Sequence, residues 1–466
     1  MASAPLDLER GGSSSDRKET EISSGAGRAR ELAIVSSVDG KSRDVKETSF
    51  PRVVAIGPYH RACEGLYFSE KYKLRILRWM NQVFHLDEKE FHMQMTEKID
   101  NIKGNYKLGS ENVSNAKFSD WLLLDSCFIF FTLKVLGCHL NDDVDEAING
   151  FQIQGDLARL KDETSFLSSN IFYHREEIRL HLIMHDNQIP FSVIYDLLET
   201  YPVLKEFIEE KSIEDLALLV FSELYPMQNT DLNQSTKPEF LHLLHLFHWS
   251  RVPTKMKYEI TKRKSQLKAP YVSSATDLQH SGITFKRKNS GSFIDITFVE
   301  GCFKMMGYIN IPVIHINEYN GIIFRNLFAF EQNETKAGGC FTAYSTWLAH
   351  LLQSEEDVKL FRKNRIVPST PTPDYEVVQF FHDLKKERIK NSTDITKEIP
   401  ELYDLFKKVR DHNEGTVNQC YGEFKLRYCS NFWVTLGIML FGVVTLVQTT
   451  YTVLSYYATL KGNNKN

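Results

Sequence analysis

The chain has 466 residues, of which 42% are hydrophobic and 12% aromatic, and its formal net charge is -4. A chain of this size and composition can bury a large core. The slightly acidic charge balance excludes a broadly basic nucleic-acid-binding protein, so no nucleic-acid partner is expected. The seven cysteines lie at wide, irregular spacings that match neither a disulfide framework nor a paired-cysteine metal site, which favours reduced thiols.

The first segment, residues 1–45, is polar and rich in Ser, Gly, Arg and Glu. Because it has too few apolar side chains to offset the entropy of ordering, it is predicted to be disordered. It also lacks the continuous apolar core of a secretory signal. A globular body is predicted from residue 46 to residue 425.

The body opens with a short apolar run, Val53–Ile56, which Gly57 and Pro58 end as a turn. A helix is predicted over residues 68–92. Its apolar residues recur at helical spacing, whereas its basic residues occupy the other faces; the former are Leu74, Leu77, Met80, Val83 and Phe84, and the latter are Lys71, Lys73, Arg75 and Arg78.

Residues 118–136 form an almost unbroken apolar run that contains Asp125. A buried core helix fits this run, and an enclosed Asp125 then needs a hydrogen-bond partner. The next segment, 178–201, is predicted as helix, break, helix, because Pro190 ends or kinks what precedes it. The polar residues Asp186, Asn187 and Gln188 are interpreted as caps of the helix before the proline break.

Further elements follow the same logic. Short strands are predicted around residues 292–317, where β-branched and aromatic residues alternate with others. Helices are predicted on both sides of them: 203–225, 239–249, 321–332, 340–353, 355–365, 375–388 and 401–410. The fold class is therefore mainly α with a small β-sheet (α+β), as a single large globular body plus one C-terminal transmembrane helix.

The membrane helix is predicted over residues 431–456, followed by a short polar tail, 457–466. Its core, Phe432–Leu454, carries no charge, and its roughly 23 residues would make a helix of about 35 Å. The alternative is a buried core helix. Because the span lies at the C-terminal end, a single-pass anchor with the body in the cytosol is favoured, in the plasma membrane or an endomembrane.

One face of this span carries small and polar residues, which are Gly442, Thr445, Gln448, Thr449 and Thr452. Small residues let helix backbones approach closely in lipid, and an amide there seeks a hydrogen bond. This pattern indicates lateral association with a second copy or with another membrane helix. The alternative is that the hydroxyl groups bond back to carbonyls one turn earlier.

The histidines and cysteines are the residues that could form a catalytic or metal site. His242, His245 and His248 recur every three residues, but no carboxylate base lies between them, and a zinc site is disfavoured. His181 and His185, with Asp186 beside them, form a second histidine pair, and a zinc site is disfavoured there as well. Phosphate-binding, dinucleotide-binding and serine-hydrolase motifs are absent from the sequence. No catalytic residue, metal or cofactor is therefore expected; the alternative is a hydrolase-like enzyme with a Cys/His or His–metal site.

Six sequence blocks in order carry a resemblance to the plant family called domain of unknown function 247: Ala55–His60, Leu122–Ile129, Asp186–Phe191, Ser274–Lys286, Asp295–Met305 with Ile309–Ile316, and Phe324–Gln332. The resemblance covers about residues 45 to 457 and includes Gln448–Tyr451 inside the span. The chain departs from the family pattern at Ser126, Phe131 and Asp186.

The resemblance implies a plant protein with a large body and a C-terminal membrane helix. Some grass members of the family look like male-side determinants of self-incompatibility. The expected function is protein–protein recognition or scaffolding at a membrane, with an unknown protein partner, in self-incompatibility or signalling. The residues that match the family motifs are Gly57, Pro58, Tyr59, Asp125, Cys127, Asn187, Gln188, Pro190, Arg325, Asn326, Glu331 and Gln332.

Overall fold

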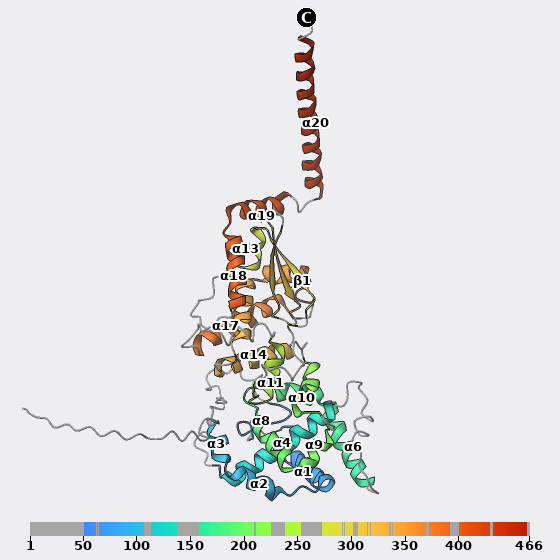
Figure 1. The fold of residues 1–466 in the computed structure, drawn as a ribbon, viewed down its shortest axis with the longest axis vertical. Coiled ribbons are helices and arrows are strands. Elements are labelled where there is room, and N and C mark those ends of the chain that lie inside the picture. The colour runs from blue at the N-terminus through green and yellow to red at the C-terminus, as the bar shows by residue number, and fades with distance from the viewer. Residues whose placement is uncertain are drawn as a thin grey trace, which may run out of the picture. The chain divides into compact units, whose positions relative to one another are not determined.

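The computed structural model confirms a mainly helical fold with a small sheet (Figure 1). It describes residues 51–61, 63, 65–106, 113–137, 158–208, 211–224, 238–252, 273–290, 292, 294–301, 306–314, 316, 318–334, 337, 339–369, 372–391, 400–428 and 432–463. These residues belong to the compact unit Ala33–Asn466. The segment 1–45, predicted to be disordered, lies outside the described residues.

The first group of helices packs around one buried helix, α4. Its members are α1 (Glu70–Phe84), α2 (Glu88–Thr96), α3 (Ile99–Gly104), α4 (Asn115–Gly137), α6 (Ala158–Tyr173), α7 (Arg175–Leu182), α8 (Phe191–Thr200), α9 (Pro202–Phe207) and α10 (Ile213–Ser222). Helix α4 is buried along nearly its whole length and packs against α1, α2, α3, α6, α8 and α10. The prediction of a core helix over 118–136 is confirmed.

The predicted helix 68–92 is two helices, α1 and α2. His85 ends α1 in the left-handed conformation with φ 55°, and the Asp87 side chain then caps α2 by accepting a hydrogen bond from the Lys89 N–H. The buried face of α1 also differs from the prediction, since Lys73 is buried whereas Leu74 is 37% exposed. Lys73 turns inward because it meets a buried carboxylate on α4.

The predicted helix 203–225 is likewise two helices, α9 and α10. Helix α10 begins with a capping box: the Ser212 side chain accepts from the Asp215 N–H, and the Asp215 carboxylate accepts from the Ser212 N–H. This reciprocal pair satisfies two backbone donors that a helix start leaves free. The break between α7 and α8 lies where Pro190 predicted it, because Pro190 immediately precedes α8.

The second group of elements surrounds a three-stranded sheet and begins with α11 (Leu243–Arg251) and α13 (Ala275–His280). The strands are β1 (Ile283–Lys288), β2 (Thr297–Glu300) and β3 (Gly307–Pro312), in the order β1-β3-β2. β1 is parallel to β3, and β2 is antiparallel to it. Two strands lie in the predicted segment 292–317, and β1 lies before it.

The remaining helices are α14 (Glu318–Asn333), α15 (Cys340–Leu351), α16 (Glu355–Lys363), α17 (Asp374–Asn391), α18 (Pro400–Asn413), α19 (Thr416–Tyr428) and α20 (Phe432–Asn463). α18 packs on β2, and α19 packs on α13 and α18 (Figure 1). Within α20, residues Trp433–Ala458 are long and apolar enough to cross a membrane, with a mean hydropathy of 1.6. The side chains in that apolar window are not buried against the rest of the described chain.

Candidate functional site

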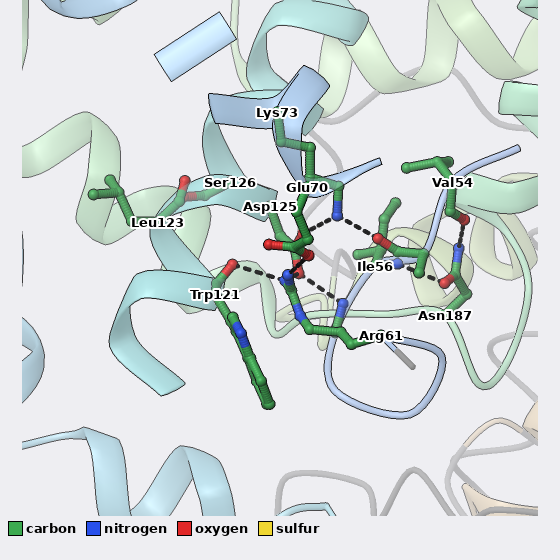
Figure 2. A network of polar contacts seen from close by, with 12 residues as sticks. Val54, Ile56, Arg61, Glu70, Lys73, Trp121, Leu123, Asp125, Ser126 and Asn187 are labelled. Carbon is green, nitrogen blue, oxygen red and sulfur yellow. Dashed lines mark hydrogen bonds and ion pairs between the residues drawn. The ribbon is translucent and has the colours of Figure 1, made fainter. Parts of the chain in front are cut away.

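A buried polar junction joins the family-like motifs of the first helix group (Figure 2). At its centre is Asp125 of α4, whose side chain is fully buried. Its Oδ2 accepts from the Gly57 N–H at 2.8 Å and from the Arg61 guanidinium, and its Oδ1 accepts from the Lys73 ammonium. Lys73 also donates to the Ala55 carbonyl. One carboxylate thus joins α4, α1 and the loop between residues 55 and 61.

The charges in this junction balance within it. The Arg61 guanidinium also donates to Glu70 and, at 3.0 Å, to the Trp121 carbonyl. Two cations therefore meet two carboxylates. Burial lowers the pKa of Lys73, an effect that the adjacent Asp125 opposes. Asp125, Lys73 and Arg61 are buried, and their pairing fixes geometry because each of them would be costly to bury alone, whereas the Glu70 side chain is 43% exposed.

The Gly57–Pro58 turn lies directly against the Asn187–Gln188 motif. Gly57 has φ +72°, and a Cβ at this position would lie 2.6 Å from the Gln188 carbonyl oxygen. The same carbonyl accepts a hydrogen bond of 3.1 Å from the Tyr106 hydroxyl. Only glycine fits both the left-handed backbone and this close approach. Tyr59 completes the turn with an edge-to-face contact to Tyr106 at 5.7 Å.

The amides at the break cap the end of α7, the helix before the proline break, as the sequence predicted for Asn187 and Gln188. Asn187 donates to the His181 carbonyl at 3.0 Å, and its Oδ1 accepts from the Ile56 N–H at 2.6 Å. Gln188 donates to the Leu182 carbonyl at 2.8 Å. The last carbonyls of a helix lack intrahelical partners, and these amides satisfy them. Pro190 immediately precedes α8, and no side chain caps the start of that helix.

A second buried carboxylate, Glu331 on α14, holds the start of α15. It accepts from the N–H groups of Phe341 and Thr342 at 2.9 and 2.8 Å and lies 2.8 Å from His248 Nε2. A carboxylate is favoured there by the partial positive charge of a helix N-terminus. Asn326, on the same helix, accepts from the His185 N–H at 2.8 Å.

The three histidines at positions 242, 245 and 248 have separate structural roles. His242 precedes α11 and caps it by accepting from the His245 N–H at 3.2 Å, so the three histidines do not share one helix. His245 Nδ1 accepts from the Leu241 N–H. Within the part of the chain that the structure describes, no group of three or more His, Cys, Asp or Glu side chains could hold a metal ion.

Two histidines and one carboxyl group at the α7–α8 break have shifted pKa values. Burial lowers the pKa of His181 and of His185 to about 4. Burial raises the pKa of Asp186 to about 6. The His181 ring is also used structurally, because its Nδ1 accepts from the Val54 N–H at 3.2 Å. The two histidines are therefore uncharged at neutral pH, and the His181 ring supports the fold around the break.

The remaining motif residues lie outside these networks or at their edges. Cys127 is fully buried, and burial raises the pKa of its thiol, which makes it a poor nucleophile. Arg325 lies 5.9 Å from the Phe380 ring. The Gln332 side-chain nitrogen is buried without a hydrogen-bond partner. The described motif residues therefore contribute mainly to internal contacts.

An exposed aromatic patch, here defined as Tyr67, Phe166 and Tyr173, lies where the loop before α1 meets α6. Their exposed fractions are 48%, 44% and 79%. The Tyr67 hydroxyl donates to Asn170 of α6 at 2.6 Å, and the Arg75 guanidinium stacks over Phe166 at 4.0 Å. Sequence analysis missed this patch, although the spacing of Phe166, Asn170 and Tyr173 along one helix face was a usable signal.

The small and polar residues of α20 are all exposed. The hydroxyls of Thr445, Thr449 and Thr452 each donate to the carbonyl four residues earlier, at 2.8 Å. This is the intrahelical bonding that the sequence left as an alternative. An added Cβ at Gly442 would meet no atom within 4 Å. The face that the sequence singled out is thus uncovered within the described chain.

Comparison with known proteins gives a family match and two curated relatives. Residues 35–447 match the model of DUF247, described as a plant protein of unknown function. The chain is 23% identical over 428 residues to UPF0481 protein At3g47200 of Arabidopsis thaliana, covering 89% of this chain and 84% of that protein. It is 29% identical over 115 residues to Putative UPF0481 protein At3g02645 of the same plant, covering 25% and 21%. No solved structure matches the chain.

Proposed function

Since the chain belongs to the DUF247 family of plant proteins, we propose from its own residues that it is a membrane-anchored protein that recognises or scaffolds another protein. The observation that carries the proposal is α20. Its 26-residue apolar segment, Trp433–Ala458, has the length and composition of a membrane span. Exposed apolar area of this extent needs a covering, and a bilayer provides one along the whole helix.

The recognition half of the proposal is supported by the aromatic patch. Tyr and Arg are enriched in the parts of protein interfaces that contribute most binding energy. Tyr67 and Phe166 are already held in place by Asn170 and Arg75, so binding a partner would order few additional side chains. The process that this recognition serves, self-incompatibility or another form of signalling, is part of the same proposal.

The proposal assigns no catalytic step to the chain. The buried carboxylates Asp125 and Glu331 are engaged by backbone donors or cations, and Cys127 is enclosed. A protein that presents a surface from a membrane needs none of these groups to be reactive. The orientation that we propose places the body in the cytosol, because basic residues are more numerous on the body side of α20, at positions 407, 408, 410, 425 and 427, than beyond it, at 461 and 465.

Anchoring is tested by alkaline extraction of plant membranes. The full chain should stay in the membrane pellet after carbonate treatment, whereas a chain without residues 432–463 should be extracted. Orientation is tested by adding protease to sealed microsomes, which should digest the body. Extraction of the full chain would contradict the anchor; protection of the body, or glycans on Asn112 or Asn233, would contradict its cytosolic placement.

Recognition is tested by proximity labelling in plant cells with the full chain. The paired substitution Tyr67→Ala and Tyr173→Ala should remove a defined set of labelled neighbours. Tyr375→Ala is a matched control, because Tyr375 is an exposed tyrosine of α17, outside the patch, at 58% exposure. An unchanged set of neighbours after the paired substitution would show that the patch is not the recognition surface.

A further inference from the structure

Helix α19 has one face packed on the body and one face that the body leaves open. Gly422 marks the packed face: a Cβ there would lie 1.9 Å from the His280 carbonyl oxygen and 2.4 Å from the Gly282 nitrogen. This approach leaves room only for glycine, so α19 is set directly against the end of α13. Val417, in contrast, is 64% exposed, and Cys420 is also exposed.

Apolar and aromatic residues recur on the open side of α19. At about 100° per residue, five apolar or aromatic positions fall within about 100° of the helix circumference. They are Val417, Cys420 and Tyr421 and, by helical spacing in the sequence, positions 424 and 428. The sequence has basic residues at positions 425 and 427, next to this set on either side. An apolar helix face with Lys and Arg at its edges can lie in a membrane interface, where the basic groups reach the headgroups.

The covalent connection to α20 limits where α19 can lie. α19 ends at Tyr428 and α20 begins at Phe432. Four successive Cα steps span at most about 15 Å. If α20 crosses a bilayer, the end of α19 therefore lies within about 15 Å of the membrane surface. Interfacial helices bury their apolar face about 5–10 Å into the boundary between headgroups and acyl chains. The open face of α19 is close enough to the bilayer to reach this boundary.

The contacts of α19 with the body are polar as well as steric. Asn418 donates to the His412 carbonyl at 2.9 Å, and Gln419 donates to the Asn413 carbonyl at 3.0 Å. The Asn413 side chain in turn donates to Ser273 Oγ, just before α13, at 3.1 Å. α18, α19 and α13 are thus linked by bonds that would have to break for α19 to rotate its open face toward the body.

We infer that α19 is an interfacial helix, which lies in the headgroup region with its open face toward the acyl chains. Its occupant is the lipid bilayer itself. Through Gly422 it holds α13 and the start of β1 next to the membrane, so the body has a fixed orientation on the bilayer rather than hanging from a free tether. This inference rests on the proposed anchoring by α20.

The test uses the full chain in vesicles of phosphatidylcholine and phosphatidylserine. A photoreactive benzoylphenylalanine is placed singly at position 417, at position 446 of α20, or at position 93 of α2. Val417 and Met93 are matched, since both are apolar and exposed, at 64% and 70%. Illumination should give lipid adducts from positions 417 and 446, and only background from position 93.

The three positions separate the two proposals. Lipid adducts at position 446 without adducts at position 417 would leave the anchor standing and overturn the interfacial helix. Adducts from position 417 to protein instead of lipid would overturn it too, by showing that a protein covers the open face. Failure at both 417 and 446 would overturn the anchor and, with it, the inference that rests on it.

Discussion

The junction around Asp125 and the helix α20 both hold polar groups within apolar sequence, but they satisfy those groups in opposite ways. Asp125 is bound by Lys73, Arg61 and the Gly57 N–H, which lie 52, 64 and 68 residues away along the chain. In α20, the hydroxyls of Thr445, Thr449 and Thr452 each bond a carbonyl four residues earlier. The junction therefore depends on the complete fold, whereas α20 satisfies its hydroxyls by itself.

The comparison teaches where single substitutions should matter. Removing one member of the junction leaves buried charges or backbone donors without partners, whose desolvation is no longer offset. Removing a hydroxyl from α20 leaves only a carbonyl that is already bonded within the helix. We expect effects on stability to be large in the junction and small in α20, where association is the property to measure.

The largest effect is expected for Asp125→Ala. Lys73 and Arg61 would remain buried without their shared carboxylate, and breaking a buried pair in this way costs about 3–5 kcal/mol. Urea unfolding of the full chain in detergent, followed by tryptophan fluorescence, measures the loss. Glu163→Ala is the control, because it breaks the more exposed pair with Arg75 and should cost less than about 1 kcal/mol. Equal losses for the two variants would break the comparison.

Acid should be the next largest perturbation, and it acts at the α7–α8 break. The pKa values of His181 and His185 are lowered to about 4 from 6.5, so the unfolded state binds more protons as pH falls below 6.5. Stability is therefore lost between pH 6.5 and 4, by roughly 2 kcal/mol for each histidine at pH 5. Asp186, whose pKa is raised to about 6, opposes this with roughly 1 kcal/mol, since its protonated form is favoured in the fold.

Unfolding at pH 7, 6 and 5 checks this expectation. The variant His185→Gln removes one of the two titrating rings, so its stability should fall less between pH 7 and 5 than that of the unchanged chain. The difference in slope is the informative quantity, since the substitution itself shifts both measurements. Parallel slopes would show that His185 does not titrate differently in the folded and unfolded states.

A smaller loss is expected for Gly57→Ala. The substitution combines a left-handed backbone with a Cβ placed 2.6 Å from the Gln188 carbonyl oxygen, and such strain costs about 1–3 kcal/mol. Gly65→Ala is a matched control, because Gly65 has φ +79° but no atom within 4 Å of an added Cβ. The thermal unfolding midpoint of Gly57→Ala should lie below that of Gly65→Ala. Equal midpoints would assign the whole cost to the backbone angle and none to the contact.

The smallest effect concerns association through α20. Gly442→Leu and Gln448→Leu should weaken lateral association by about 0.5–2 kcal/mol, since they remove close approach and an amide from one face. Crosslinking of the isolated α20 segment in membranes measures this. Leu436→Ala, on another face, is the control. Stronger weakening by the control than by the two face substitutions would place the contact elsewhere on the helix.

Sequence patterns predicted the features that depend on neighbouring residues. The apolar run of α4 and the break at Pro190 follow from local composition. The split between α9 and α10 was missed, although the Ser212–Asp215 capping box is a local signal, because apolar spacing across it favours one continuous helix.

Features that join distant segments could not be predicted in this way. Lys73 was assigned to a solvent-facing surface of α1, since its inward position depends on Asp125 of α4. Strand β1 was missed because its partner is β3, and parallel pairing joins strands that are not adjacent along the chain. The contact of Gly57 with Gln188 belongs to the same class: each motif was visible, but their meeting was not.

The order of strands in the sheet has a consequence during protein synthesis. β3 is the middle strand, so β1 and β2 wait for a partner until residue 312 has left the ribosome. α18 and α19, which pack on β2 and α13, emerge later still. At about 5–20 residues per second, the 32 residues of α20 follow within about 2–6 s. The last contacts of the body therefore form within the same few seconds as the synthesis of α20.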